Sequence, residues 1–359
     1  MPAWLYALLV FGPLAILGRA AGVSDVLVFA AACVGLVPLA GLIGHATGQV
    51  ALHLGAQWGG LLNATFGNAA ELIITLLALR EGLFILVKAS ITGSIVGNTL
   101  LVLGLALLAG GARHGVLRFD VRLTSLNAAL MMLAVAGLLL PAVFGTLVAD
   151  AARLEELSVL VALILLLSYA AYLLFLLRGS QGWLVEERGQ DSSVTPDWTL
   201  RRGLLTLAAA TLGTAVVSES LVGAVEPVTA QLGWTELFVG VILVPIVGNA
   251  AENWAAVRAA WRNHVNLTLG ITSGSSTQIP LFVAPVLILA SLVIGRPMTL
   301  VFEPLELLVL ALSTAIFAYI SLDGESHWLE GVLLLALYLM TAAVFFLDPV
   351  SAAPLVENT

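Results

Sequence analysis

The sequence contains very little charge. Of its 359 residues only 10% are Asp, Glu, Lys or Arg, whereas 60% are hydrophobic, and the mean hydropathy is +1.07. A soluble protein carries roughly 25% charged residues to cover its surface. This composition excludes a water-soluble globular domain and indicates a polytopic membrane protein, so the lipid bilayer is its first expected partner.

Basic residues and cysteine are also scarce. The chain has 14 Lys and Arg against 22 Asp and Glu, which gives a formal net charge of −8. No basic stripe is present, and this argues against a nucleic-acid partner. The single cysteine, Cys33, has no partner for a disulfide or a metal site, so it is expected to pack within an apolar helix. No resident cofactor is expected.

Long apolar stretches are abundant, and a membrane helix needs about 20 such residues. The sequence predicts an all-α membrane protein with about eleven transmembrane helices. Their expected ranges are 2–21, 24–44, 57–79, 82–110, 122–147, 154–178, 201–224, 232–258, 264–294, 302–321 and 327–347. The longest polar interval, residues 179–200, contains four acidic residues before Leu200 and is interpreted as an exposed acidic connector between two halves.

The two halves share a motif. The pentapeptide GNAAE occurs at Gly67–Glu71 and again 181 residues later at Gly248–Glu252, and the triplets at 92–94 and 273–275 are related by the same spacing. Five helices repeated in tandem must cross the membrane in opposite directions, which predicts inverted repeats of the kind found in secondary transporters. The expected organisation is a first helix at 1–22, repeats at 23–178 and 201–348, the connector at 179–200 and a tail at 349–359.

Each copy of the motif places a carboxylate deep in an apolar segment. Glu71 and Glu252 have no Lys or Arg close to them in their segments. A carboxylate at membrane depth is costly, so it normally faces the protein interior and takes part in function. Asn68 and Asn249 precede the glutamates by three positions, which puts amide and carboxylate on the same helical face.

The glycines of the motif suit an ion site. Gly67 and Gly248 weaken the helix, and unwound backbone at membrane depth is tolerated where it lines a cavity and coordinates ions. Carboxylate, amide and carbonyl oxygens together suit a hard divalent cation such as Ca²⁺. Two neighbouring buried carboxylates would hold protons when the site is empty. Two protons exchanged for one Ca²⁺ would conserve the charge of the site.

Other polar residues accompany these segments. We expect Ser94, Ser275 and Gln278 to line a cavity beside the glutamates. Glu219, in the segment 201–224, is a third acid at membrane depth and is interpreted as a proton-path residue.

These motifs resemble a known family. The segments GGLLNATFGNAAELIITLLAL, KASITGSIVGNTLLVLG, VPIVGNAAENWAAV and SGSSTQIPLFVAP are similar to those of the calcium/proton exchangers of the cation/Ca²⁺ exchanger superfamily. The resemblance implies a transporter and not an enzyme, with two inverted five-helix repeats after an extra first helix. It implies that Glu71 and Glu252 bind Ca²⁺, that Asn68 and Asn249 assist them, and that Gln278 belongs to the second repeat's site.

The chain departs from the family pattern in a few places. Residues 46–51 read ATGQVA where members often have ATEELA, so two acids are missing. Asn253 stands where a His is frequent, and Pro280 stands where a small Ala is usual. The glutamate motifs are unaffected, but the ion access path or the number of protons can differ.

Three other functions are compatible with a polytopic membrane protein that has buried carboxylates. A Na⁺/Ca²⁺ exchanger would usually have G-[ST]-x-x-[PE]-type motifs and further acidic ligands, whereas both copies here read GNAAE and Gln278 is not accompanied by Asp. A membrane-embedded hydrolase would need a water-activating dyad, and no intramembrane His or Asp pairs with the glutamates. A cation channel fits broken inverted repeats less well than alternating access does.

The distribution of basic residues predicts an orientation. With loops assigned alternately to the two sides, nine of the 14 basic residues fall on one side and five on the other. The positive-inside rule then places the N-terminus and the connector in the cytoplasm and the C-terminus outside, in the cell (inner) membrane. With an inward proton gradient the exchanger would expel Ca²⁺.

Overall fold

The structure, a computed structural model, describes residues 3–148, 150–183 and 196–347. Most of the predicted acidic connector and the predicted tail lie outside these residues. Two short strands, β1 (Leu117–Arg118) and β2 (Glu325–Ser326), pair antiparallel. The helices in chain order are α1 (Ala3–Ala7), η1 (Leu8–Val10), α2 (Phe11–Ala20), α3 (Asp25–Phe66), α4 (Ala69–Glu81), α5 (Phe84–Val96), η2 (Gly97–Val102), α6 (Leu103–His114), α7 (Val121–Leu147), α8 (Ala151–Trp183), α10 (Leu200–Leu232), α11 (Glu236–Phe238), η3 (Val239–Leu243), α12 (Val244–Gly248), α13 (Ala250–Trp261), α14 (Val265–Gln278), η4 (Ile279–Val283), α15 (Ala284–Ile294), α16 (Pro304–Ile320) and α17 (Trp328–Leu347).

Many of these helices are long and apolar enough to cross a membrane. Within the described ranges seven helical stretches meet this criterion: Asp25–Gly55, Phe84–His114, Val121–Leu147, Ala151–Leu176, Leu200–Leu232, Val265–Ile294 and Trp328–Leu347. A bent pair, Glu236–Gly248 and Ala250–Trp261, meets at 65° and would form one further, broken span. The prediction of an integral membrane protein made of helices is therefore confirmed.

Both copies of the pentapeptide interrupt a helix. The helical path stops at Phe66 and resumes at Ala69, and it stops again at Gly248 and resumes at Ala250. The residue at each break has almost the same backbone conformation, with φ −102° and ψ 23° at Asn68 and φ −99° and ψ 7° at Asn249. The expected weakening of the helix beside the motif glycines is thus present in both halves.

Wider π-helical turns mark other positions in the long helices. The turn η3 lies just before Pro245, which has no backbone N–H to donate to the carbonyl of Val241. This freed carbonyl faces α5 at Gly93, where a Cβ would collide with the Val241 oxygen. A Cβ at Gly240 would collide with Ala89 in the same contact. Small residues therefore allow α5 to approach η3 closely, as at other helix contacts in membranes.

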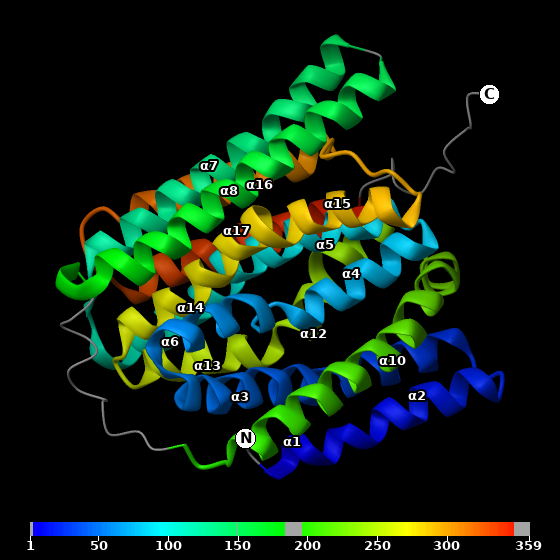
Figure 1. Ribbon diagram of the computed structural model, residues 1–359, viewed down its shortest axis with the longest axis horizontal. Coiled ribbons are helices and arrows are strands. Elements are labelled where there is room, and N and C mark those ends of the chain that lie inside the picture. The colour runs from blue at the N-terminus through cyan, green and yellow to red at the C-terminus, as the bar shows by residue number, and fades with distance from the viewer. Residues whose placement is uncertain (1–2, 149, 184–195, 348–359) are drawn as a thin grey trace.

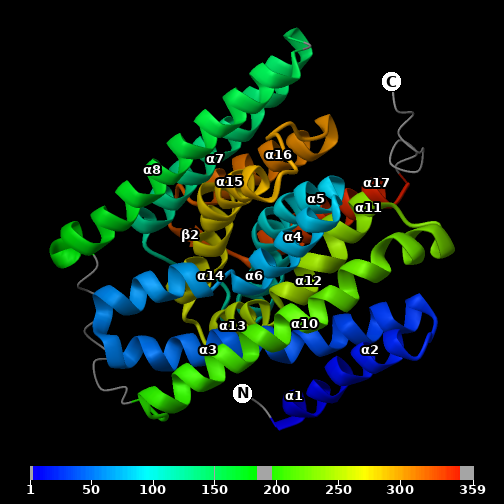
Figure 2. The ribbon, with the colours of Figure 1, turned by 45° about the vertical axis from the view of Figure 1, so that its right-hand side comes forward.

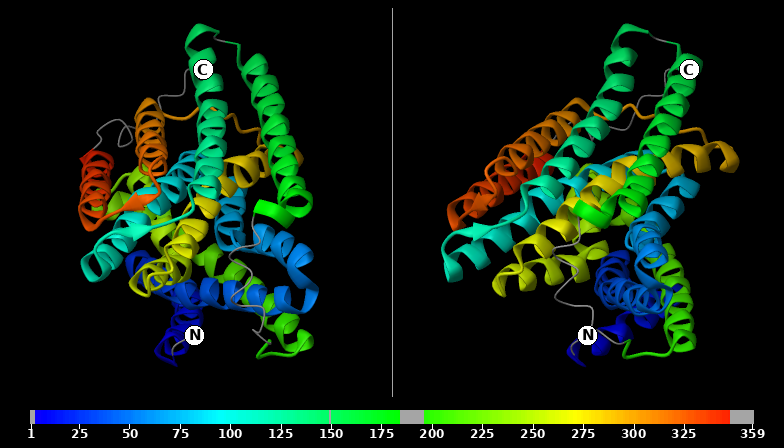
Figure 3. Two further views of the ribbon diagram at one scale, coloured as in Figure 1. Left: turned by 90° about the vertical axis from the view of Figure 1, so that its left-hand side faces the viewer. Right: turned by 60° about the vertical axis from the view of Figure 1, so that its left-hand side comes forward.

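The helices lie in a central group with further helices on both sides. Figure 1 shows α2, α3 and α10 together at one side and α7, α8 and α16 at the opposite side, with α4, α5, α12 and α14 between them. The same grouping is seen after rotation (Figure 2). In Figure 3, α7 and α8 run as two long neighbouring helices at the edge of the molecule.

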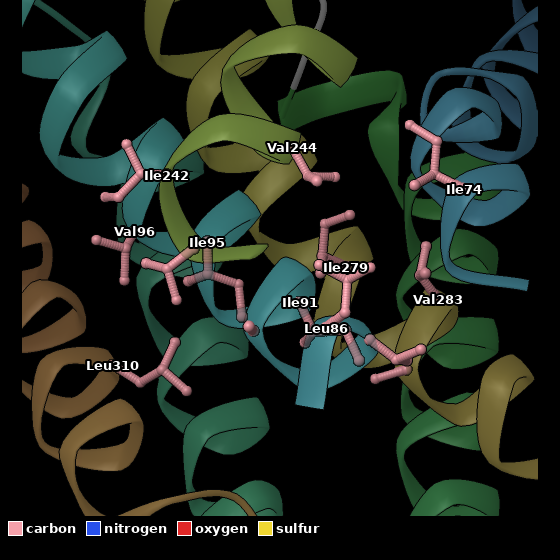
Figure 4. Close-up of a cluster of buried hydrophobic side chains, with 14 of the residues drawn as sticks. Ile74, Leu86, Ile91, Ile95, Val96, Ile242, Val244, Ile279, Val283 and Leu310 are labelled. Atoms are coloured by element: carbon pink, nitrogen blue, oxygen red, sulfur yellow. The ribbon is translucent and has the colours of Figure 1, made fainter. Parts of the chain in front are cut away.

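A large apolar core connects the two halves of the chain. Ile91 and Ile95 of α5 belong to it together with Ile242, Val244 and Ile279 from the second half (Figure 4). The tight packing of α5 on η3 lies within this core. Contacts between the halves therefore hold α5 of the first half against the broken helix of the second half.

Candidate functional site

The two motif glutamates begin the helices that follow the breaks. Glu71 lies in the first turn of α4 and is only 3% exposed, and Glu252 lies in the first turn of α13 and is half-buried. In the described structure, both carboxylate oxygens of Glu71 lack a hydrogen-bond partner, and so does Oε2 of Glu252. None of the ion pairs found there includes either carboxylate. Both carboxylates thus have oxygens that no protein donor satisfies, and Glu71 has no donor at all.

The breaks bring these carboxylates together. A Cβ at Gly248 would lie 3.4 Å from Oε1 of Glu71, so the carboxylate from the first half lies against the interruption in the second half. The carboxylates of Glu71 and Glu252 are close enough to repel each other. The absence of a side chain at Gly248 leaves open the space beside Glu71.

A polar network ties the first break to α14. Asn68 donates from Nδ2 to Oε1 of Gln278 at 2.5 Å, and Ser275 donates from Oγ to Oδ1 of Asn68 at 3.0 Å. Ser275 is also a hydrogen-bonding neighbour of Glu252. The structure therefore brings together five of the predicted residues: Asn68, Glu71, Glu252, Ser275 and Gln278.

The matching network in the other half is not formed. Asn249 is buried, but its side chain makes no hydrogen bond within the described part of the chain. Ser94, which corresponds to Ser275 by the 181-residue spacing, has a buried hydroxyl without a partner. The site is asymmetric although the two pentapeptides are identical.

A cavity of about 1010 Å³ reaches the site from one end of the molecule. Gly67, Gly248, Glu252, Ser275 and Gln278 line its inner part. Glu71 is not part of the wall and lies behind it. The wall continues along the second half of α13 and the start of α14, so an ion from that end would meet Glu252 first.

Ser94 lies elsewhere than predicted. It is 1% exposed and is not part of the cavity wall. The neighbouring Gly93 packs directly against η3 and α12, which closes this stretch of α5 off from the cavity. The structure therefore does not place Ser94 on the wall of this cavity, where it was expected.

Glu219 is also outside the cavity. Its side chain is 57% exposed and forms an ion pair with Arg80 at 3.2 Å, and Arg80 also contacts Glu81 at 3.1 Å. Arg19 donates to the backbone carbonyl of Glu219 at 2.6 Å. The acid has basic neighbours from two other helices, so its position does not support the expected role in a proton path.

A further buried acid, Glu306, was not identified from the sequence. It is 1% exposed, and its Oε1 accepts a hydrogen bond from Thr92 at 2.8 Å while its Oε2 accepts one from the backbone N–H of Glu303 at 3.0 Å. Both oxygens are satisfied, in contrast to those of Glu71. In the sequence, Glu306 follows Glu303 by three residues at the start of an apolar segment. This spacing is the pattern of a helix capping box and could have indicated its structural role.

The unpartnered carboxylates limit the chemistry of the site. An ionised carboxylate buried without a partner is very unfavourable, so it must be neutralised by a proton or a cation. No group of three or more His, Cys, Asp or Glu side chains that could hold a metal occurs among the described residues. Two carboxylates with amide and hydroxyl oxygens nearby can take either protons or a hard cation.

The chain is similar to known proteins over most of its length. The family model described as "Sodium/calcium exchanger protein" matches residues 24–178 and 202–347. The chain is 44% identical over 365 residues to a Ca²⁺/H⁺ antiporter of Aphanothece halophytica, covering 96% of both chains. It is 40% identical over 338 residues to the Ca²⁺/H⁺ antiporter ChaA of Bacillus subtilis, covering 93% of this chain and 96% of the relative.

A solved structure is similar over almost the whole chain. The crystal structure of the selenium-substituted Ca²⁺/H⁺ antiporter protein YfkE superimposes with a TM-score of 0.84 at 37% sequence identity. The match covers 96% of this chain and 100% of that structure. The matched family segments fall on either side of the predicted connector, and each contains one GNAAE motif. The chain belongs to the sodium/calcium exchanger protein family.

Proposed function

We propose that the protein is a secondary active antiporter that exchanges Ca²⁺ for H⁺ across a membrane. The observation that carries this proposal is the pair of carboxylates beside a cavity, one from each half, in which both oxygens of Glu71 and Oε2 of Glu252 lack a protein hydrogen-bond partner. The Ca²⁺/H⁺ antiporters named among its relatives support it. The protein is a transporter and catalyses no chemical reaction.

The exchange follows from charge balance at the two glutamates. With no cation bound, Glu71 and Glu252 hold protons, because two neighbouring carboxylates cannot both remain ionised in an apolar environment. Ca²⁺ displaces these protons and is neutralised by the two carboxylates. The amide oxygens of Asn68 and Asn249 and the backbone beside Gly67 and Gly248 complete the oxygen ligands of the transported ion.

The proposed membrane topology has eleven spans. The helix near the N-terminus, Leu5–Ala20, precedes two repeats at 23–178 and 201–348. Within each repeat a long helix is followed by a helix broken at GNAAE and then by a long helix with a π-helical turn. In the first repeat the long helix and the start of the broken one both lie in α3, which is interrupted at Gly55, where φ is 78°. This shared order, together with the odd number of spans per repeat, supports inverted repeats.

The unequal polar networks support alternating access. In the conformation described, Asn68 is bonded to α14 while Asn249 and Ser94 are unpartnered. In the conformation open to the other side, Asn249 and Ser94 pair and the bond from Ser275 to Asn68 is released. The distribution of basic residues supports a cytoplasmic N-terminus and an external C-terminus in the cell membrane.

The test is ⁴⁵Ca²⁺ uptake into proteoliposomes loaded at low internal pH and diluted into buffer at higher pH. The proposal predicts uptake in the complete absence of Na⁺. Because the matching family model is described by sodium/calcium exchange, the same vesicles are also tested with an outward Na⁺ gradient and equal pH on both sides. Uptake driven only by Na⁺ would replace the proposal with Na⁺/Ca²⁺ exchange.

A further inference from the structure

The charges along the cavity are distributed unexpectedly for a cation route. Glu252 is the only acidic side chain among the described residues that line it, whereas Arg258 and Arg262 also line it. Two histidines, His45 and His264, complete the ionisable lining groups. With neutral histidines the wall carries two positive charges against one negative charge, and it repels an entering cation before the ion reaches Glu252.

These two arginines are not neutralised by the protein. Both are exposed, and neither makes an ion pair or a side-chain hydrogen bond in the part of the chain that the structure describes. Arg113, at the same end of the molecule, differs because it donates to the Trp261 carbonyl at 3.3 Å and stacks on the Trp261 ring at 4.8 Å. The free guanidinium groups of the cavity wall therefore act as uncompensated charges.

Their distance from the site follows from helix geometry. Arg258 and Arg262 follow Glu252 by six and ten residues along α13 and its C-cap. At about 1.5 Å per residue they lie roughly 9 and 15 Å along the helix axis from the carboxylate. Because both line the cavity, an ion inside it lies within the range of both charges at low ionic strength.

We propose that Arg258 and Arg262 determine specificity by opposing Ca²⁺ more strongly than H⁺. A divalent cation experiences twice the repulsive energy of a monovalent one, so its binding is weakened by the square of the factor that applies to a proton. The pair thereby raises the Ca²⁺ concentration at which exchange begins from this side. This inference rests on the proposed Ca²⁺/H⁺ antiport.

The expected size of the effect depends on salt. At an ionic strength of ~0.01 M, where the Debye length is about 30 Å, the two charges in a hydrated cavity weaken Ca²⁺ binding by about fivefold. At ~1 M the Debye length is about 3 Å, and the same calculation leaves a factor close to 1. If replacing the two arginines changed the Ca²⁺ affinity by altering the structure of the site, the change would persist at ~1 M salt.

The experiment measures the Ca²⁺ dissociation constant of the purified full chain by isothermal titration calorimetry at fixed pH in low and high KCl. The variant R258Q/R262Q is expected to bind about fivefold more tightly than the wild type at ~0.01 M and equally at ~1 M. The variant R258K/R262K keeps both charges and is expected to match the wild type. R122Q removes an exposed charge outside the cavity wall and is also expected to match it.

Two other results would overturn the inference. Equal dissociation constants for R258Q/R262Q and the wild type at low salt, or a difference that persists unchanged at ~1 M, would show that no electrostatic barrier exists. Wild-type uptake driven by a pH gradient is measured on the same preparation. Absence of that uptake would contradict the proposed function, whereas uptake with unchanged affinities would contradict only the barrier.

Discussion

Replacing Asn68 by Ala tests the asymmetry of the site. Asn68 joins the first break to α14 through its bonds with Gln278 at 2.5 Å and Ser275 at 3.0 Å. The substitution leaves both partners without their bonds. Asn249→Ala is the matched control, because it removes the same side chain from the same pentapeptide where no hydrogen bond is formed.

The magnitude follows from the two lost bonds. Leaving a buried polar group unsatisfied costs about 1–3 kcal/mol. Gln278 is half-buried and borders the cavity, so water recovers part of its loss, whereas Ser275 is only 7% exposed. We expect Asn68→Ala to lower the free energy of unfolding by about 2–3 kcal/mol. For a chain of this size that corresponds to a fall in Tm of about 2–4 °C.

Thermal unfolding in detergent at saturating H⁺ and without Ca²⁺ measures this difference. Asn249→Ala is expected to change Tm by less than ~1 °C, since it breaks no bond. Both variants are expected to bind Ca²⁺ more weakly, because each loses a proposed oxygen ligand. If the two variants lost equal stability, the network around Asn68 would not be the source of the asymmetry.

Three further predictions concern packing, the second buried acid and pH. Gly93→Ala places a methyl group against the Val241 carbonyl, so this variant is expected to aggregate or elute as several species in size-exclusion chromatography. Gly274→Ala, at the corresponding position of the second half, meets open space and is expected to elute as a single peak. Glu306→Gln keeps only one acceptor oxygen for the two donors of Glu306, so it is expected to lower the free energy of unfolding, and with it Tm, by about 1–3 kcal/mol, while Ca²⁺ binding persists. Loss of Ca²⁺ binding with an unchanged Tm would contradict this structural role. The Ca²⁺ dissociation constant is expected to rise as pH falls, by up to ~100-fold per pH unit where both carboxylates are protonated. If calorimetry gave the same dissociation constant at every pH, protons and Ca²⁺ would not compete for the site.

Some of the site was accessible from the sequence for clear physical reasons. An unpaired carboxylate in a 20-residue apolar segment is rare and costly, so its occurrence twice in the same pentapeptide identified Glu71 and Glu252. Glycine and asparagine inside an apolar run indicated the interrupted helices, which the structure has at both positions. Pro245 could equally have indicated the irregular turn before it.

Other features depend on contacts between distant residues. The sequence predicts a proton-path acid at Glu219 because nothing local reveals its partner Arg80, which lies 139 residues away in the chain. Glu306 accepts from Thr92, which is 214 residues away, and nothing local distinguishes it from an ordinary helix cap. Two identical pentapeptides contain no information about which asparagine is bonded, because that depends on which side of the site is open.

Under the proposed function, Glu71 and Glu252 bind Ca²⁺ and protons in turn. This exchange is tested most directly by Ca²⁺-driven proton release from proteoliposomes that contain the wild type, Glu71→Gln or Glu252→Gln, with a pH-sensitive dye and no Na⁺. Each substitution keeps the shape of the side chain but removes one negative charge and one titrating group. Release is expected to be abolished in both variants although each remains folded and monodisperse. Near-normal proton release from both variants would contradict this exchange and would leave the two GNAAE motifs with a structural role only.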